Sequence, residues 1–351
     1  MTDVAVVGFA QAPNVRNTAG TTNGVEMLVP IFHEVFERTG LSKHDIGFFC
    51  SGSSDYLAGR AFSFIAAVDA IGAVPPINES HVEMDAAWAL YEAWVKIRTG
   101  EVDTALVYGF GKSSAGDLRR TLALQLDPYS VAPLWPDSVS IAGLQARMGL
   151  DAGDYTTREM AEVAVRNRAA AEDNPHAQFS GAADAEQLLG APYVAEPLRA
   201  HDCAPITDGA SVIVLAAGDR AREIHERPAW ITGMQHRIES SSLGARDLRR
   251  SSSAESAGKA LDIDGVEVAE LHAPFTHQEI LLRRALGLSE DVVVNPSGGV
   301  LCGNPMFAAG LSRIGEAAAQ VHSGRAERAL AHATSGPALQ QNLVCAMEGR
   351  A

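Results

Sequence analysis

The sequence predicts an α/β protein built from two successive halves of similar plan. Short apolar runs typical of strands alternate with amphipathic stretches of helical length along most of the 351-residue chain. The same alternation starts again after about residue 225, which suggests an internal duplication. Strands and helices that alternate in this way favour parallel pairing, with helices on both faces of the sheet.

The first half opens with strand and helix in regular alternation. We predict a strand at Val4–Phe9, a helix at Gly24–Arg38, and strands at Asp45–Gly52, Ser80–Met84 and Thr104–Gly109, with a helix at Asp85–Thr99 that ends before Gly100. The strand at Thr207–Ala216 closes this half. The N-terminal half therefore spans residues 1–225.

Between these last two strands the pattern loosens. Pro128, Pro133 and Pro136 break the region that follows Lys112, and helical periodicity returns only at Thr156–Glu172. Long excursions from an α/β core usually cover or build a site. We interpret residues 112–200 as an inserted cap or loop domain.

The second half, residues 226–351, repeats the scheme. Strands are predicted at Ala229–Gly233, Val266–His272, Val292–Asn295, Arg328–His332 and Leu343–Met347, and helices at Ala254–Leu261, Gln278–Leu286 and Ala308–Ser323. Between the third strand and the last helix lies the glycine-dense run Asn295–Gly310. Backbone so rich in glycine can approach a ligand closely, and the start of a helix favours an anionic or carbonyl-bearing ligand.

Composition limits the class of protein. The 28 basic and 43 acidic residues give a formal net charge of −15, which argues against a general nucleic-acid surface. No apolar run approaches the ~20 residues of a membrane span and the N-terminus does not resemble a signal peptide, so we expect a cytoplasmic protein. Cys50, Cys203, Cys302 and Cys345 are widely spaced and are expected to be reduced thiols, with neither a disulfide framework nor a metal site.

Four positions are candidates for a functional edge. They are Met84 at a strand-to-helix junction, His272 and His332 at strand ends, and Asn304 in a Gly-Asn-Pro corner. Ligands of parallel α/β sheets bind beyond the carboxyl ends of the strands. All four positions fall on that edge.

Several motifs, in this order along the chain, together resemble the thiolase superfamily. They are Asp202–Ala210, Glu270–Phe275, Asn295–Gly299, Gly303–Pro305 with Gly310, and the strand that holds His332. The resemblance is strongest to the thiolase domain of sterol-carrier-protein-x and to actinobacterial lipid-transfer-type thiolases. It covers essentially the whole chain and implies a duplicated, five-layered α/β/α/β/α fold with a loop domain, usually in an oligomer.

The resemblance also exposes departures at the catalytic positions. In the family a nucleophilic cysteine opens a helix that ends about sixteen residues later in glycine, and counting back from Gly100 places Met84 there. A thioether cannot form the acyl-enzyme. The activating histidine of the family's Gly-His-Pro corner is replaced by Asn304, which can donate a hydrogen bond but cannot take a proton at neutral pH. Pro274 replaces the second catalytic cysteine, and His272 is kept.

The residues expected to line the pocket are Trp88, Gly298, Gly299, Cys302, Gly303 and Phe307. Trp88 and Phe307 stand where the family has small residues, and they would narrow the cavity. Each candidate also has a structural interpretation. His272 is either an oxyanion donor or base, or a histidine held by hydrogen bonds; Cys302 is either a displaced thiol or a small buried hydrophobe. Glu83 and Asp85 form either an acid/base pair or ordinary partners of the helix dipole.

Three functions remain open. The chain is a non-catalytic subunit that stabilises an active thiolase-like paralogue within a complex that degrades lipid or steroid side chains, with a small OB-fold-type accessory protein as a further partner. Alternatively, it is a retro-aldol or other C–C lyase that uses His272. A third possibility is a carrier of acyl-CoA or lipid. In each case a coenzyme A thioester is the expected ligand or substrate, and no tightly bound cofactor is implied.

Overall fold

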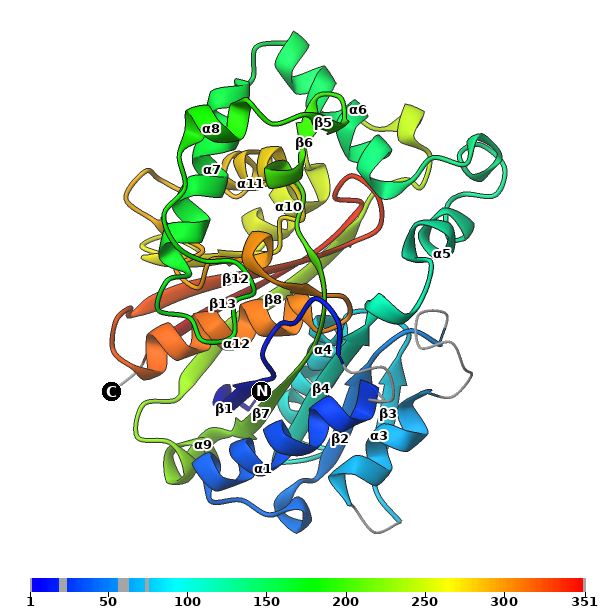
Figure 1. The fold of residues 1–351 in the computed structure, drawn as a ribbon. Helices are drawn as coiled ribbons and strands as arrows, with labels where there is room; N and C mark the ends of the chain where they lie inside the picture. The colour runs from blue at the N-terminus through cyan, green and yellow to red at the C-terminus, as the bar shows by residue number, and fades with distance from the viewer. Residues whose placement is uncertain (1, 19–23, 56–62, 73–75, 350–351) are drawn as a thin grey trace.

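The computed structural model describes residues 2–18, 24–55, 63–72 and 76–349. Figure 1 shows the N-terminal half in blue and cyan, the C-terminal half in yellow to red, and the inserted region in green above the C-terminal half. Within the described ranges, no helix combines the length and apolar character needed to cross a membrane.

Ten strands of the described structure overlap predicted strands, and three short ones, at Tyr193–Ala195, Leu198–Arg199 and Asn304–Pro305, were not predicted. The strands are β1 (Val4–Gln11), β2 (Phe48–Gly52), β3 (Glu79–Val82), β4 (Thr104–Lys112), β5 (Tyr193–Ala195), β6 (Leu198–Arg199), β7 (Ile206–Ala217), β8 (Ala229–Ile238), β9 (Val268–Leu271), β10 (Val293–Val294), β11 (Asn304–Pro305), β12 (Arg328–Ser335) and β13 (Gln341–Gly349).

The helices include three in the inserted region that the sequence pattern did not reveal, α5, α6 and α8. The helices are α1 (Leu28–Thr39), α3 (Ser63–Ile71), α4 (Ala86–Arg98), α5 (Leu118–Leu124), α6 (Ser138–Asp151), α7 (Thr157–Ala170), α8 (Ala185–Leu189), α9 (Gly218–Ile224), α10 (Ser252–Lys259), α11 (Thr276–Ala285) and α12 (Ala309–His322).

The two halves use the same strand order. In the first half the order is β3-β2-β4-β7-β1 and in the second it is β10-β9-β12-β13-β8, and the two join where β1 pairs with β8. The expected parallel pairing holds for β2 with β3 and β4 and for β9 with β10 and β12. However, β7 runs antiparallel to β4 and β1, and β13 runs antiparallel to β12 and β8. A short connection such as the one between β12 and β13 can join only antiparallel strands.

The predicted five layers are present. α1, α3 and α9 cover the outer face of the first half, where they pack with one core cluster, and α10 and α11 cover the outer face of the second. α4 and α12 form the middle layer with a second core that includes residues of both halves. This arrangement brings the N-termini of α4 and α12 together between the two halves of the sheet.

Buried polar contacts fasten the inserted region to the C-terminal half. Arg166 and Asn167 of α7 both bond to the Glu279 carboxylate of α11, with 2.9 Å between Asn167 Nδ2 and Glu279 Oε2. Gln145 of α6 accepts from Gln278 at 2.9 Å and donates to the Leu248 carbonyl at 3.0 Å. Because Glu279 and Gln145 are fully buried, breaking these contacts would leave polar groups without partners.

Candidate functional site

A buried aspartate joins the two central helices. Asp85 precedes α4 and its Oδ1 accepts from Ala87 N at 2.9 Å, as expected for a helix N-cap. The same carboxylate accepts from Gly310 N at 2.9 Å and Leu311 N at 3.1 Å, at the start of α12. The anion that we expected as a ligand at this second helix start is therefore a side chain of the chain itself.

Asp85 is only 5% exposed. Burial raises its pKa, and the three backbone N–H donors oppose that rise. A backbone hydrogen bond also holds the Asp85 side chain in position. Ala86 N donates to Phe307 O at 2.9 Å, so the start of α4 is bonded directly to the corner before α12.

The residues on either side of Asp85 lie in contact with the apolar core. Met84, at the expected nucleophile position, is partly buried and packs against the central cluster, and Trp88 belongs to that cluster with 7% exposure. The Trp88 ring meets the His236 ring edge to face, with centroids 6.1 Å apart. Glu83 is exposed, so it does not share the buried environment of Asp85.

The glycine-dense run is held in shape by two buried carboxylates. Asn295, with φ of 52°, accepts from Leu271 N at 2.7 Å and donates to Glu279 at 2.7 Å. Ser297 bonds through both N and Oγ to Glu270, whose carboxylate also pairs with Arg313 at 2.6 Å. Burial raises the pKa of Glu270 to about 6, and the Arg313 charge opposes this shift.

Gly298 and Gly299 follow with φ of 93° and 62°, a region that side chains other than glycine rarely adopt. A Cβ at Gly298 would lie 2.5 Å from the Ala171 Cβ, just after α7. The run thus packs closely against the inserted region. Cys302, buried beside it, donates from Sγ to the Asn167 carbonyl at 3.4 Å.

The Gly-Asn-Pro corner continues the sheet. Asn304 pairs with Ile206 and Pro305 with Thr207 in a short parallel ladder with β7, and Gly111 of β4 admits the backbone of Met306. Asn304 is 9% exposed and its Oδ1 is buried without a hydrogen-bond donor in the described part of the chain. Gly303 lies against Asn14, and Phe307 is partly buried with φ of 68°.

The two candidate histidines lie on neighbouring parallel strands. His272 N donates to the His332 carbonyl at 3.2 Å, and Thr334 N points to His272 Nδ1 at 3.5 Å. A donor at Nδ1 favours the neutral tautomer with its proton on Nε2. Burial lowers the pKa of His272 to about 3 and that of His332 to about 4, so both rings are neutral at pH 7.

His332 has a clear structural role. Its Nε2 lies 2.8 Å from Asn342 Oδ1, and Asn342 Nδ2 donates to Ser251, Ser253 and the Leu339 carbonyl. His332 is fully buried in this network. It belongs to the support of the sheet, one strand away from His272.

One segment lies between His272 and Asn304. Ala204 N donates to Pro274 O at 2.8 Å, and two residues later Ile206 pairs with Asn304. His272 and Asn304 therefore flank the segment that leads into β7, without a bond between them in the described structure. Burial raises the pKa of the Cys203 thiol to about 12 and that of Cys302 to about 11, so neither forms a thiolate readily.

Sequence comparison supports the family likeness. No protein-family model matches the chain. It is 27% identical to an acetyl-CoA acetyltransferase of Methanothermobacter thermautotrophicus over 290 residues, which are 74% of this chain and 76% of that protein. It is 25% identical to sterol carrier protein 2 of Homo sapiens over 315 residues, 77% of this chain and 56% of that protein. The chain is a thiolase-superfamily homologue.

Three further similarities concern this thiolase homologue. Over 179 residues it is 30% identical to the 17-hydroxy-3-oxo-4-pregnene-20-carboxyl-CoA lyase of Mycobacterium tuberculosis, covering 48% of this chain and 46% of that one. The fold matches a Bacillus anthracis acetyl-CoA acetyltransferase with a TM-score of 0.81, over 100% of this chain and 99% of that one, at 16% identity. It also matches an Ltp2-ChsH2(DUF35) aldolase with a TM-score of 0.80, over 98% of both chains, at 17% identity.

Sequence reasoning on this thiolase homologue missed the main feature of the site. The position of Asp85 before an amphipathic helix predicted a partner for one helix dipole. That the carboxylate also caps α12 depends on contacts between residues 225 positions apart, which no local pattern records. The Glu270–Arg313 and Glu279–Arg166 pairs were missed for the same reason.

Proposed function

We propose that this chain is a thiolase-fold subunit of a complex that processes acyl-CoA thioesters, and that it does not itself carry out thiolysis. We divide it into halves at residues 1–225 and 226–351, with a cap insertion at about 112–200. The observation that carries the proposal is the Asp85 carboxylate, which takes N–H donors from the starts of both central helices. Met84 beside it supplies no nucleophile.

The chemistry of a thiolase needs a thiolate at this junction and a base beside it. When the backbone N–H groups at two helix N-termini have no other acceptor, they also stabilise the thiolate and the oxyanion that develops in the reaction. Here the Asp85 carboxylate occupies these N–H donors, and in its ionised form it would repel both the thiolate and the oxyanion. Asn304 cannot act as the base. The remaining residues support binding and assembly better than covalent catalysis.

A surface for the partner is available beside the same helix. β3 pairs with β2 alone among the described strands, and its residues are partly exposed. On α4 the partly buried rings of Tyr91 and Trp94 lie next to Val95, which is 39% exposed. A strand edge that no other described strand pairs, beside apolar side chains, suits an antiparallel strand from a second thiolase-like chain.

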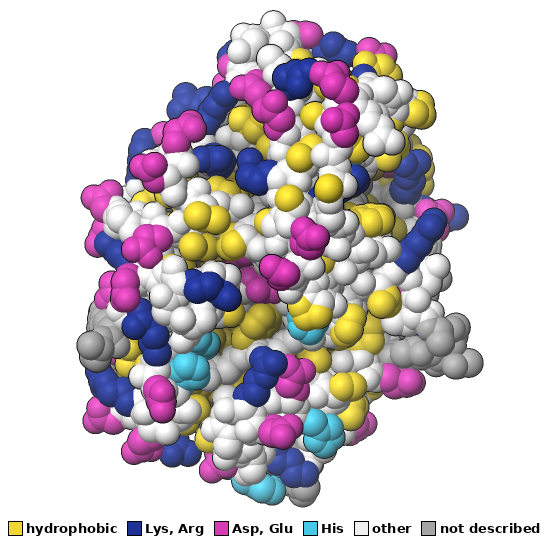
Figure 2. All heavy atoms as spheres, turned by 60° about the vertical axis from the view of Figure 1, so that its left-hand side comes forward, with side chains coloured by type: hydrophobic (Ala, Val, Ile, Leu, Met, Phe, Trp, Pro, Cys, Tyr) yellow, Lys and Arg dark blue, Asp and Glu magenta, His cyan; other side chains and the backbone are white. Residues whose placement is uncertain are grey.

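The relatives suggest the class of substrate. One of them is named as a lyase of a steroid carboxyl-CoA, and one structural neighbour is an aldolase in complex with ChsH2(DUF35). We therefore propose a steroid or fatty acyl-CoA thioester as substrate of the complex, and a thiolase-like paralogue together with a small OB-fold-type accessory protein as partners. On the face shown in Figure 2, basic side chains are interspersed with acidic ones, an arrangement unlike a nucleic-acid surface.

A second candidate, a retro-aldol C–C lyase, is favoured by the aldolase neighbour and by the lyase relative. In that reaction a base removes the proton of the β-hydroxyl group, and donors stabilise the enolate of the thioester. His272 with its proton on Nε2 fits the role of donor, as does Asn304. With a pKa of about 3, His272 is too weak a base at neutral pH, so we rank this candidate second.

The test compares the purified chain alone with the chain co-expressed with its thiolase-like paralogue. With acetoacetyl-CoA and coenzyme A, we expect thiolysis only from the complex, and no acyl adduct on this chain by mass spectrometry. Thiolysis by this chain alone that survives alkylation of all four cysteines would rule out the proposal. Retro-aldol release from a β-hydroxyacyl-CoA that is lost in His272→Gln would instead establish the lyase.

A pair of variants tests the assignment of the positions. Met84→Cys together with Asn304→His and Asp85→Ala should introduce measurable thiolysis or an acyl adduct at residue 84, whereas the double variant that keeps Asp85, the matched control, should give neither, because its carboxylate still occupies the N–H donors of both helix starts. A folded triple variant without any adduct would contradict the placement of the nucleophile at Met84.

A further inference from the structure

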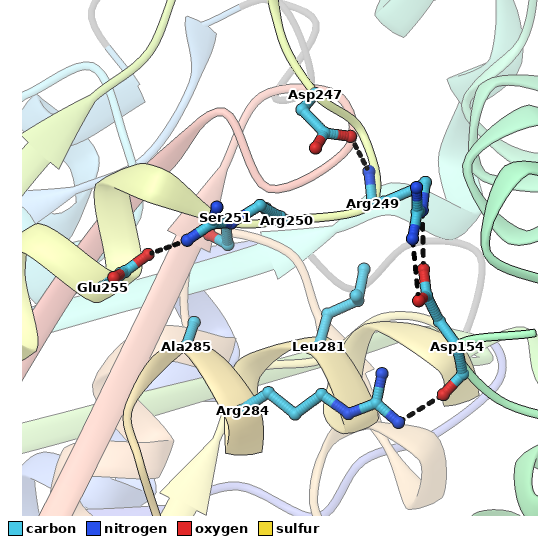
Figure 3. A pocket seen from close by; sticks show the side chains of 9 residues that line it. All are labelled: Asp154, Asp247, Arg249, Arg250, Ser251, Glu255, Leu281, Arg284 and Ala285. Atoms are coloured by element: carbon cyan, nitrogen blue, oxygen red, sulfur yellow. Dashed lines mark hydrogen bonds and ion pairs between the residues drawn. The ribbon is translucent and has the colours of Figure 1, made fainter. Parts of the chain in front are cut away.

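A surface pocket of about 470 Å³ lies between the inserted region and the C-terminal half, away from the Asp85 junction. It lies between the turn that follows α6, the segment that leads into α10, and the outer side of α11 (Figure 3). Its lining is formed by Asp154, Asp247, Arg249, Arg250, Ser251, Glu255, Leu281, Arg284 and Ala285. Its volume falls within the range of small-molecule sites, ~300–1,000 Å³.

Three guanidinium groups supply the polar wall of this pocket. Arg249 binds Asp154 with two bonds of 2.7 and 2.9 Å, Arg284 donates to the Asp154 carbonyl, and Arg250 donates to Glu255 at 3.1 Å. A guanidinium has five N–H donors, so each of the three keeps donors that the described protein groups do not use. Such groups recognise phosphate oxygens in bidentate fashion.

The acidic residues of the pocket are already engaged. Asp247 accepts from Arg249 N at 3.1 Å, and Glu255 is bonded to Lys259 at 2.6 Å as well as to Arg250. Arg249 and Arg250 are 42% and 63% exposed, and exposed ion pairs contribute little free energy. An incoming phosphate can therefore share or replace these carboxylates at low cost. Leu281 and Ala285 provide an apolar wall from α11, as Figure 3 shows.

We propose that this pocket binds a phosphorylated small molecule of nucleotide size, with its phosphate on Arg250 and Arg284 and its apolar part against Leu281 and Ala285. The pocket exceeds what inorganic phosphate alone would fill. Ser251, at the cap of α10, adds a helix N-terminus whose dipole also favours an anion.

The pocket is connected to the candidate histidines by hydrogen bonds. Ser251 accepts from Asn342 Nδ2 at 3.2 Å, and Asn342 Oδ1 lies 2.8 Å from His332 Nε2. The proposed ligand binds on the outer side of this network, whereas His272 lies on the other side of His332. The inference does not depend on the proposed function, because it concerns binding to a different set of residues.

The experiment is a calorimetric titration of the full chain with AMP, inorganic pyrophosphate and adenosine at low ionic strength. We expect saturable binding of AMP, weaker binding of pyrophosphate, and none of adenosine. Arg284→Gln and Arg250→Gln should each weaken AMP binding roughly tenfold, because each removes a charged hydrogen bond to phosphate. Arg220→Gln, which alters an exposed Arg–Glu pair on α9, is the control and should bind as the wild type does.

Two results would overturn the proposal. One is the absence of saturable AMP and pyrophosphate binding to the wild type up to millimolar concentration. The other is binding that persists unchanged in both Arg284→Gln and Arg250→Gln, which would place the phosphate elsewhere. Both arginines lie at the surface, so thermal melting of each variant should match that of the wild type; if one variant unfolds, the other decides.

Discussion

Replacing Asp85 by alanine tests the double cap most directly. The change removes the acceptor of three buried N–H groups, those of Ala87, Gly310 and Leu311. Each unsatisfied buried N–H costs about 1–3 kcal/mol, and the loss of charge at two helix starts costs about 0.3–1 kcal/mol each. Two effects offset this cost: the charge no longer needs to be buried, and water can enter the vacated space.

The net loss in the free energy of unfolding should be about 3 kcal/mol for Asp85→Ala and smaller for the isosteric Asp85→Asn, which keeps one acceptor oxygen. Asp137→Ala is the matched control. Asp137 caps only α6, through Ser140 N at 2.7 Å, and its side chain is 24% exposed. Its removal should cost about 1 kcal/mol, the usual value for an N-cap.

Chemical denaturation measures these losses, and amide hydrogen exchange locates them. In Asp85→Ala, exchange at Gly310 and Leu311 should accelerate together with exchange at Ala87, although the first two lie at a different helix. If Asp85→Ala were no less stable than Asp137→Ala, or if Gly310 exchanged as slowly as in the wild type, the double cap would not hold α12 in place.

Three more predictions follow from burial and close packing. First, stability should fall as pH decreases below about 6.5: burial lowers the pKa of His272 and His277 to about 3, so the unfolded chain takes up protons that the folded chain cannot. The loss is about 2 kcal/mol per histidine at pH 5, and a melting temperature constant from pH 7 to 5 would contradict it. Second, Cys203, Cys302 and Cys345, with pKa values raised by burial to about 12, 11 and 12, should react with a disulfide reagent at pH 8 far more slowly in the native than in the unfolded protein; complete reaction within seconds would show that they are accessible. Third, Gly111→Ala should destabilise the protein by more than 1 kcal/mol, because its Cβ would lie 2.1 Å from the Met306 carbonyl, whereas Gly116→Ala, with no atom within 4 Å, should be nearly neutral in the same unfolding measurement.

Local sequence pattern was sufficient for most of the sheet and for the middle helices. The strand predicted at Thr207–Ala216 is β7 within one residue at each end, and the helix predicted at Ala308–Ser323 is α12 with the same margin. Both segments are strongly apolar and have clear boundaries. Local pattern could not predict that β7 runs antiparallel to β4, because the direction of β7 depends on where the inserted region after β4 brings the chain back to the sheet.

The inserted region was less predictable. Pro128, Pro133 and Pro136 correctly indicated a break, but they precede α6, whose buried face is made largely of small residues such as Ala142, Gly143 and Ala146. Small residues give a weak hydrophobic period. A glutamine such as Gln145 is usually exposed, so the sequence gives no sign that it is buried on that face. Its hydrogen-bond partners His277 and Gln278 lie far along the chain, in α11.

Contacts between residues far apart in the sequence also shape the site, and they decide which chemistry can take place there. From the sequence, Met84 marked the absence of a nucleophile, which left open whether the two helix starts still form an oxyanion site. Asp85 closes that option, because its carboxylate bonds to Ala87, Gly310 and Leu311. A new oxyanion at this junction would have to displace a buried charge that three donors hold, at a cost of several kcal/mol. Any reaction of a thioester on this chain would therefore have to use donors elsewhere, and we propose His272 and Asn304 as the side chains that supply them. A test that removes those donors separates a lyase from a binding subunit, whereas restoring a cysteine alone does not.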